Sequence, residues 1–129
     1  MIQKLSIRNF KSIRELDLDC RRVNVFIGEP NAGKTNILEA LGLWCPGVHA
    51  ELRRVYRAEY VSELFFDQSV KETVCILLDN EEAKLFKTEE GAVLRFPNPG
   101  SWPEDEVHVE RVRIKDNLAI ETRHPRYWV

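Results

Sequence analysis

The chain contains 129 residues, and its 19 Lys and Arg residues against 21 Asp and Glu residues give a formal net charge of −2. This length suits one domain and excludes a multi-domain machine within this chain, while 43% hydrophobic and 31% charged residues are typical of a folded globular domain. The near-neutral charge excludes an overall basic field that attracts nucleic acid, so any such contact must be local.

Three short patterned runs predict three strands before residue 28, at about residues 2–7, 16–18 and 23–27. The third run, VNVFIG, has apolar side chains on both faces, which favours a strand buried in the middle of a sheet. From Gly33 the apolar spacing becomes helical, and Cys45-Pro46-Gly47 is expected to end this helix. A second helical pattern covers residues 50–65.

The second half of the chain returns to the spacing of strands, which we expect at residues 72–78, 92–96, 107–115 and 118–122. Asp116-Asn117 fits a two-residue hairpin turn, and residues 97–105, with three prolines, predict an exposed irregular loop. The pattern therefore predicts one α/β unit, with more antiparallel strands in its second half than in its first.

The cysteines and apolar runs bear on the cellular location. Three cysteines without a CxxC pair exclude a disulfide framework, and the three histidines share no metal-ligand spacing. The longest aliphatic run, residues 74–78, is far too short to span a bilayer. We expect a soluble protein of the reducing cytoplasm with no membrane partner.

Residues 28–35 read GEPNAGKT and match G-x-x-x-x-G-K-[ST], the Walker A pattern. Glycines let successive amides turn toward phosphate oxygens, and the following helix adds its positive end. Lys34 is expected to reach the β- and γ-phosphates, and the Thr35 hydroxyl to ligate Mg²⁺. The candidate nucleotide-binding residues are Gly28, Glu29, Pro30, Asn31, Ala32, Gly33, Lys34, Thr35 and Asn36. A chance glycine-rich turn is the alternative, which the predicted flanking strand and helix disfavour.

The flanks of this loop make a more specific resemblance. Asn9-Phe10-Lys11-Ser12 and the string TNILEAL, residues 35–41, resemble the opening of the RecF/SMC/OLD group of ABC-type ATPases. The resemblance covers about a third of the chain and implies a P-loop NTPase fold, with a central strand, the phosphate loop and a helix. It also implies that Lys11 and Ser12 approach the nucleotide phosphates, although both would fit a tight surface turn without that role.

One departure and one alternative bear on this resemblance. Pro30 removes one amide from the phosphate cradle, which predicts a lower affinity than is typical of the group. The string GEPNAGKT is also similar to the first motif of Era-like GTPases, but their DxxG and NKxD motifs do not occur in the chain. ATP is therefore favoured over GTP, and Asn36 after Thr35 favours the DNA-repair and defence branch over transporters.

Parts of an ABC-type ATPase are missing from the chain. No Ser-Gly signature occurs, and the apolar run that ends at Asp79 continues with Asn80, unlike a Walker B carboxylate pair. Gln68 is a candidate for the residue that reaches Mg²⁺ or the attacking water, with a solvated turn glutamine as the alternative. The crowded Arg53, Arg54 and Arg57 fit a solvated helix better than a nucleic-acid contact.

Residues 1–129 are therefore interpreted as the N-terminal lobe of an ATPase head, without its signature and Walker B motifs. Alone, it should bind ATP weakly and hydrolyse little. By resemblance, the intact protein binds Mg-ATP, pairs as a homodimer through its heads and couples ATP hydrolysis to DNA repair or phage defence. The alternatives are a stand-alone nucleotide-binding regulatory module and an Era-like GTPase. Trp102, Tyr127 and Trp128 are candidates for contact with the remaining lobe or a partner.

Overall fold

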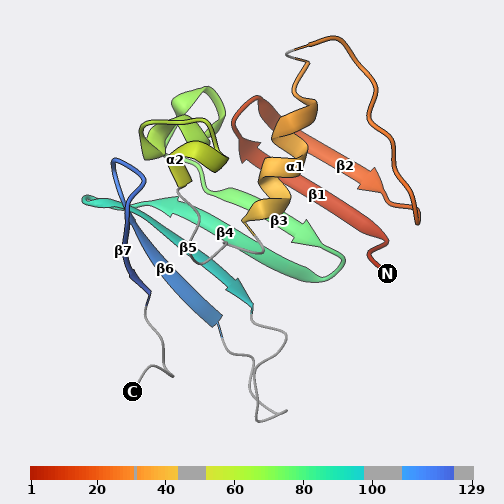
Figure 1. The fold of residues 1–129 in the computed structure, drawn as a ribbon. Helices are drawn as coiled ribbons and strands as arrows, with labels where there is room; N and C mark the ends of the chain where they lie inside the picture. The colour runs from red at the N-terminus through yellow and green to blue at the C-terminus, as the bar shows by residue number, and fades with distance from the viewer. Residues whose placement is uncertain (31, 44–51, 98–108, 124–129) are drawn as a thin grey trace.

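The computed structural model describes residues 1–30, 32–43, 52–97 and 109–123. Within this part, seven strands form one sheet in the order β2-β1-β3-β4-β5-β6-β7 (Figure 1). Every neighbouring pair is antiparallel. The strands are β1 (Lys4–Phe10), β2 (Ile13–Asp19), β3 (Val74–Leu78), β4 (Glu81–Lys87), β5 (Gly91–Pro97), β6 (Val109–Lys115) and β7 (Ile120–Arg123).

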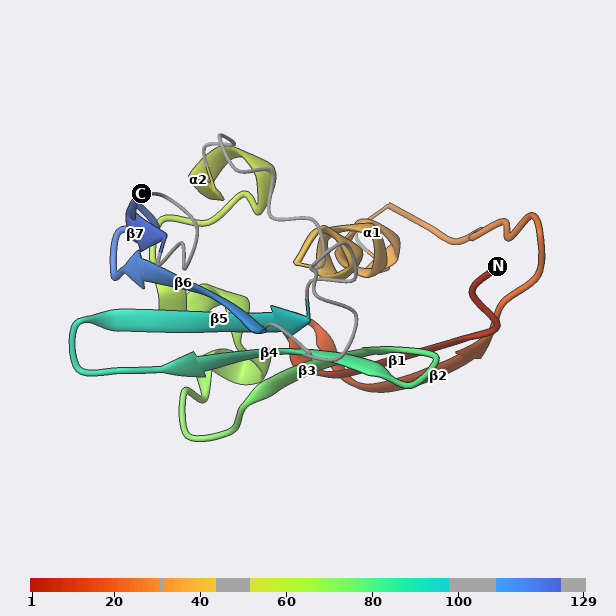
Figure 2. The same ribbon diagram turned by 90° about the horizontal axis from the view of Figure 1, so that it is seen from below.

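Among the described residues, the helical elements all fall between β2 and β3. They are α1 (Lys34–Gly42), α2 (Leu52–Val55) and the 3-10 turns η1 (Val61–Leu64) and η2 (Phe66–Gln68). Figure 2 shows α1 and α2 on the same side of the sheet. The opposite face of the sheet carries neither of these helices.

The core forms where this helical side meets the sheet. Alternate strand residues are buried, as expected for a sheet with one covered face. They include Leu5, Ile7, Val74, Ile76, Ala83, Leu85, Ala92, Leu94, Val112 and Ile114. From α1, Ala40 and Leu43 join this core, whereas Leu38 is 61% exposed. The apolar side chains of α1 therefore do not form one uniformly buried stripe.

The prediction of a strand over residues 23–27 is wrong in this structure. The segment has no regular secondary structure, and Val23 and Val25 are each 75% exposed and Ile27 91% exposed. A strand requires a hydrogen-bonded neighbour, and no described strand lies beside this segment. The central strand expected before the phosphate loop is therefore not formed, although the apolar sequence for it is present.

The prediction of a long second helix over residues 50–65 is also wrong. The α-helix α2 ends at Val55, and Arg57 has a φ of 51°, in the left-handed region that breaks a right-handed helix. The chain then continues through the two 3-10 turns, which bury Val61 and Leu64. Residue 51 and the preceding residues of the prediction lie outside the described part.

The remaining strand predictions hold, within a few residues at the ends, and one strand was missed. The pattern did not predict β4, which pairs with β3 through a tight turn at Asp79 and Asn80. The expected helix end at Cys45-Pro46-Gly47, the loop after Pro97, and Trp102, Tyr127 and Trp128 lie outside the described residues. In the part that the structure describes, no helix has the length and apolarity needed to cross a membrane.

Candidate functional site

The glycine-rich loop of residues 28–36 leads into the first turn of α1. Gly33 is the N-cap of this helix, with a φ of 93°, and Lys34 is its first residue. A Cβ added to Gly33 would lie 3.0 Å from the Ser12 Oγ atom. Glycine is needed at this position because of both its left-handed backbone and the close approach of Ser12. Asn31 lies outside the described residues.

Gly28 has no comparable constraint in this structure. A Cβ there would meet the Ala32 Cβ at 3.5 Å and the Lys34 Cδ at 3.6 Å, which are ordinary van der Waals distances. The loop between the two glycines is closed by a turn, since the Ala32 amide donates to the Glu29 carbonyl at 3.2 Å. The two glycines of the motif therefore differ in how strictly this backbone requires them.

The Lys34 ammonium folds back over its own loop. Its Nζ atom donates to the carbonyl of Gly28 and to that of Glu29, the latter at 2.7 Å. Carbonyl oxygens are weaker partners for an ammonium than the anionic oxygens of a phosphate. A phosphate group held by this loop would therefore compete with the two carbonyls for the Lys34 ammonium.

The turn between β1 and β2 holds the start of α1 through two side chains. The Asn36 Nδ2 atom donates to Ser12 Oγ at 2.6 Å, and the Lys11 Nζ atom donates to Glu39 Oε2 at 2.7 Å. Lys11 has a φ of 50°, which turns the backbone so that both residues of the turn face the helix. The structure thus brings Lys11 and Ser12 against α1, with Ser12 beside Gly33.

Glu39 is the centre of a buried charged cluster. Its side chain is 6% exposed, and it accepts from the largely buried Lys11 and, at 2.9 Å, from the Nε atom of the more exposed Arg57. The Lys11 ammonium also donates to the Tyr56 carbonyl at 2.6 Å. Desolvation by burial, with the Glu39 carboxylate second, raises the pKa of the Tyr56 hydroxyl well above its usual value.

A cavity of about 550 Å³ lies between β2, the loop and α1. This volume falls within the range of small-molecule sites, about 300–1,000 Å³. Its polar groups come from Ser12, Arg14, Glu15 and Lys34, and its apolar wall from Val25, Phe26, Ile27 and Ile37. The cavity therefore joins the glycine-rich loop to the exposed apolar segment that precedes it.

The structure places the other candidate residues as follows. Gln68 is exposed at the end of η2. The preceding segment lies beside the β1–β2 turn, because Phe65 forms a β-bridge with Phe10 and the Leu64 carbonyl accepts a hydrogen bond from the Lys11 amide. Arg57 is paired with Glu39, and Arg53 and Arg54 are exposed on α2.

Asp79 accepts hydrogen bonds from the start of β1. Its Oδ1 atom accepts from the amides of Gln3 and Lys4, each at 2.9 Å, and these hydrogen bonds hold the pKa of its carboxyl below the usual value. These bonds secure the start of β1, whereas the Lys11–Ser12 turn follows its end, roughly 20 Å away for a seven-residue strand. Asp79 therefore lies far from the glycine-rich loop.

The start of α1 offers one hydroxyl oxygen that could hold a magnesium ion together with phosphate oxygens. The described residues contain no group of three or more His, Cys, Asp or Glu side chains that could hold a metal by themselves. Mg²⁺ is commonly bound through one or two protein oxygens, substrate phosphates and water. The exposed Thr35, one residue into α1, fits the role of such a single oxygen ligand.

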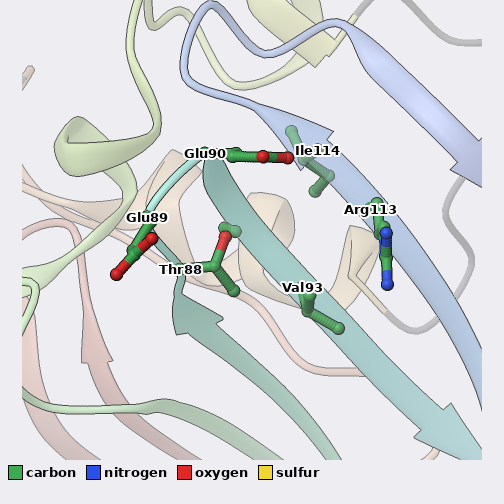
Figure 3. A pocket seen from close by; sticks show the side chains of 7 residues that line it. Thr88, Glu89, Glu90, Val93, Arg113 and Ile114 are labelled. Atoms are coloured by element: carbon green, nitrogen blue, oxygen red, sulfur yellow. The ribbon is translucent and has the colours of Figure 1, made fainter.

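A second cavity, of about 310 Å³, lies at the other end of the molecule, beside the β4–β5 turn (Figure 3). Thr88, Glu89 and Glu90 of this turn line it, together with Val93 of β5 and Arg113 of β6. Two glutamates and one arginine line it, whereas two cations and one glutamate line the first cavity, and the two cavities share no lining residue.

One family model and several known proteins are similar to parts of the chain. A family model described as an AAA ATPase domain matches residues 1–89. The chain is 47% identical over 45 residues to an uncharacterised protein of Methanocaldococcus jannaschii, which is 34% of this chain and 20% of that protein. It is also 45% identical over 42 residues to a Helicobacter pylori protein named ATP/GTP phosphatase, covering 32% of this chain and 11% of that protein.

A third relative is the DNA replication and repair protein RecF of Lactobacillus acidophilus, 44% identical over 41 residues, which cover 31% of this chain and 11% of that protein. The matched stretch thus spans between a tenth and a fifth of the length of these relatives. The similarity to them is local, whereas the family model extends over most of the chain.

Proposed function

The chain belongs to the AAA ATPase domain family, and from that membership we propose that it binds Mg-ATP through residues 28–36. The observation that carries this proposal is the glycine-rich loop that ends in the left-handed N-cap Gly33 and the helix-starting Lys34. Amides at the N-terminus of a helix, with a lysine beside them, form an arrangement suited to phosphate. Membership of this family supports ATP binding and a P-loop fold, whereas the individual residue roles are part of the proposal.

Within this proposal the residues have distinct roles. Lys34 exchanges the Gly28 and Glu29 carbonyls for the β- and γ-phosphates, and Thr35 contributes its hydroxyl to Mg²⁺. The amides that follow Gly33 bind phosphate oxygens, while Pro30 offers no amide. Ser12 lies close enough to Gly33 to approach the same phosphates. Lys11 can approach the phosphates only if its ammonium leaves Glu39. Gln68 remains a candidate for contact with Mg²⁺ or the attacking water.

We further propose that residues 1–129 are the N-terminal lobe of a longer ATPase head. The exposed Val23, Val25 and Ile27 have the sequence of a strand without a strand partner. A hydrogen-bonded strand from the remaining lobe would bury this segment and complete the central strand before the loop. The much greater length of the relatives supports this proposal.

The activity of the intact protein is proposed on the same basis. It hydrolyses ATP, pairs as a homodimer through its heads and acts on DNA in repair or phage defence, in the cytoplasm. The local similarity to a protein named for DNA replication and repair supports the DNA part of this proposal. A stand-alone regulatory module remains the second candidate, because the described residues include neither a signature motif nor a carboxylate pair near the loop.

Calorimetric titration of the full-length protein tests the nucleotide proposal. With Mg²⁺ present, we expect ATP to bind at the loop and GTP to compete poorly. Equal affinity for GTP would favour the Era-like alternative, and the absence of binding for both nucleotides would contradict the proposal.

A further inference from the structure

The two residues of the β1–β2 turn face different surroundings. Ser12 lines the cavity beside the glycine-rich loop together with Lys34, whereas Lys11 does not line it. The Lys11 ammonium lies instead between α1 and the end of α2, where it donates to the Glu39 carboxylate at 2.7 Å and to the Tyr56 carbonyl at 2.6 Å. Only one residue of the turn is therefore presented to the loop.

The Lys11 ammonium is anchored well away from the start of α1. Glu39 lies six residues after the N-cap Gly33, which is about 9 Å along the helix axis. The Glu39 side chain is 6% exposed, and removing one partner of a buried ion pair leaves a charge without compensation. If Lys11 left, the partly exposed Arg57 would remain beside Glu39, but the Tyr56 carbonyl would lose its Lys11 donor. Movement of this ammonium to a phosphate is therefore strongly opposed.

The backbone of the turn depends on the same anchor. Lys11 has a φ of 50°, a left-handed conformation that costs free energy for a residue with a Cβ atom. Such a conformation persists where the surrounding contacts hold it in place. Those contacts are the two hydrogen bonds of the ammonium and the bond from the Lys11 amide to the Leu64 carbonyl at 3.1 Å. Weakening the ammonium contacts therefore loosens the turn that places Ser12.

The Ser12 hydroxyl is the group that the turn presents to the loop. Its Oγ atom accepts from Asn36 Nδ2 at 2.6 Å, and a Cβ added to Gly33 would lie 3.0 Å from it. Within the described part of the chain, no residue accepts a hydrogen bond from this hydroxyl, so its proton is available to a ligand. A hydrogen bond to an anionic phosphate oxygen is stronger than one between neutral groups. Both position and chemistry suit Ser12 to contact with a phosphate.

We propose that Glu39 is a positioning residue for nucleotide binding. Through Lys11 it fixes the β1–β2 turn, so that the Ser12 hydroxyl donates to a phosphate oxygen at the start of α1. Lys11 is the anchor between them and keeps its contact with Glu39 when nucleotide binds, unlike the phosphate contact that the family resemblance implies for it. This role rests on the proposed function, because it takes Mg-ATP as the ligand of residues 28–36.

The test measures ATP affinity in the full-length protein carrying Ser12→Ala, Glu39→Gln or both. Gln keeps the size and an acceptor oxygen of Glu39 but removes the charge that holds the Lys11 ammonium. Glu81→Gln is the matched control, because Glu81 is exposed at the start of β4 and forms no ion pair with a described residue. A fluorescent ATP analogue reports affinity, and urea unfolding reports the stability of every variant.

We expect Ser12→Ala to weaken ATP binding about tenfold, which corresponds to about 1.4 kcal/mol and suits one hydrogen bond to a charged group. Glu39→Gln should weaken it by about threefold, a partial loss of the same hydrogen bond. The double variant should bind ATP as Ser12→Ala alone does, because Glu39 acts only through Ser12 and the two losses are therefore not additive. The control should bind as the wild type does.

A second route covers the case in which Glu39→Gln does not fold. Lys11→Met removes the ammonium and keeps the apolar part of the side chain, so it breaks the anchor from the other end. Its loss of ATP affinity should also disappear in the Ser12→Ala background. A lysine that contacted phosphate directly would give a loss that adds to that of Ser12→Ala.

Three results would overturn the proposal and leave the proposed function intact. Unchanged ATP affinity in Glu39→Gln, with lower stability, would limit Glu39 to holding the fold together. Additive losses with Ser12→Ala would show that it does not act through Ser12. Tighter binding in Glu39→Gln that Lys11→Met reverses would show that Lys11 binds phosphate and that Glu39 restrains it. No ATP binding by the wild type would contradict the proposed function and this role of Glu39 together.

Discussion

Asp79 is the residue whose role changes most between sequence and structure. The apolar run before it is similar to the strand that ends in a Walker B carboxylate, yet its carboxylate secures the amides of Gln3 and Lys4. Its φ of 53° also suits the tight turn between β3 and β4, since Asp accepts left-handed angles better than most residues do. The side chain therefore ties the turn after β3 to the start of the neighbouring strand β1.

The lowered pKa of Asp79 makes stability depend on pH. A carboxyl whose pKa is lower in the folded state stabilises the protein above its unfolded pKa, and this contribution is lost as pH falls through the folded value. We expect Asp79→Asn to keep the turn and the amide hydrogen bonds. Below about pH 4, the stability of this variant should fall less steeply than that of the wild type. Urea unfolding at pH 3 and pH 7 measures this difference, and an unchanged pH dependence would contradict it.

Gly33 and Gly28 give a second prediction at this scale. Gly33→Ala should lower the free energy of unfolding by about 1–2 kcal/mol, because alanine is strained at a left-handed φ and its Cβ would approach Ser12. Gly28→Ala is the matched control, with only ordinary contacts, and should change stability much less. Denaturant unfolding checks both, and a larger loss for Gly28→Ala would show that this backbone description is wrong.

At the scale of elements, the Glu39 cluster holds α1 against the β1–β2 turn and the residues that follow α2. The sequence pattern did not indicate it, because a helical stripe identifies apolar positions and Glu39 lies on the buried side between them. Two features of the sequence could have indicated the cluster: a carboxylate flanked by the apolar Leu38 and Ala40, and a lysine in the turn between β1 and β2. Only the tertiary fold brings Lys11 and Arg57 to it.

Removing one partner of this cluster leaves a buried charge without compensation. We expect Glu39→Ala to cost about 3 kcal/mol of unfolding free energy, and Lys11→Met to cost less when combined with Glu39→Ala than when made alone. A double-mutant cycle by urea unfolding measures this coupling. Additive effects of the two substitutions would contradict a direct Lys11–Glu39 interaction.

The elements that sequence could predict are those fixed by local pattern. Alternating apolar residues predicted β1, β2, β3 and β5, and the switch to helical spacing predicted α1 at its observed start. The pattern failed where tertiary context decides. Residues 56–65 have helical spacing but turn sharply at Arg57 to bury Val61 and Leu64, and β4 was missed because its flanking glutamates obscured the alternation of Ala83 and Leu85.

For the candidate site, the motif alone predicted the loop and the helix that follows it. It could not predict that Ser12 contacts Asn36, that the Lys34 ammonium rests on the loop carbonyls, or that Glu39 holds Lys11. These contacts depend on how the β1–β2 turn packs against α1. They are properties of the folded sheet and helix together.

At the scale of the whole molecule, the exposed segment of residues 23–27 is the observation that supports the proposal of a second lobe. We expect Val25→Asp to change the stability of the 129-residue chain by no more than about 0.5 kcal/mol, as for an exposed substitution. In the longer protein, the same substitution should be strongly destabilising, because it would place a charge in a covered strand. Hydrogen exchange of the amides of residues 23–28 provides the second comparison, with protection expected only in the longer protein.

Equal tolerance of Val25→Asp in both proteins, with fast exchange in both, would contradict the proposal of a second lobe. It would favour a stand-alone module in which the segment before the loop stays exposed. The described sheet would then be the whole framework that supports the loop.

The central claim is that residues 28–36 bind Mg-ATP through the Lys34 ammonium. Its most direct test is a titration of a fluorescent ATP analogue into the wild type, Lys34→Ala and the control Lys71→Ala, which removes an exposed lysine away from the loop. We predict saturable Mg²⁺-dependent binding by the wild type and the control, and a loss of about a hundredfold or more for Lys34→Ala, as expected for a charge-assisted phosphate contact of about 3 kcal/mol. Equal affinity of Lys34→Ala and the wild type would contradict the account.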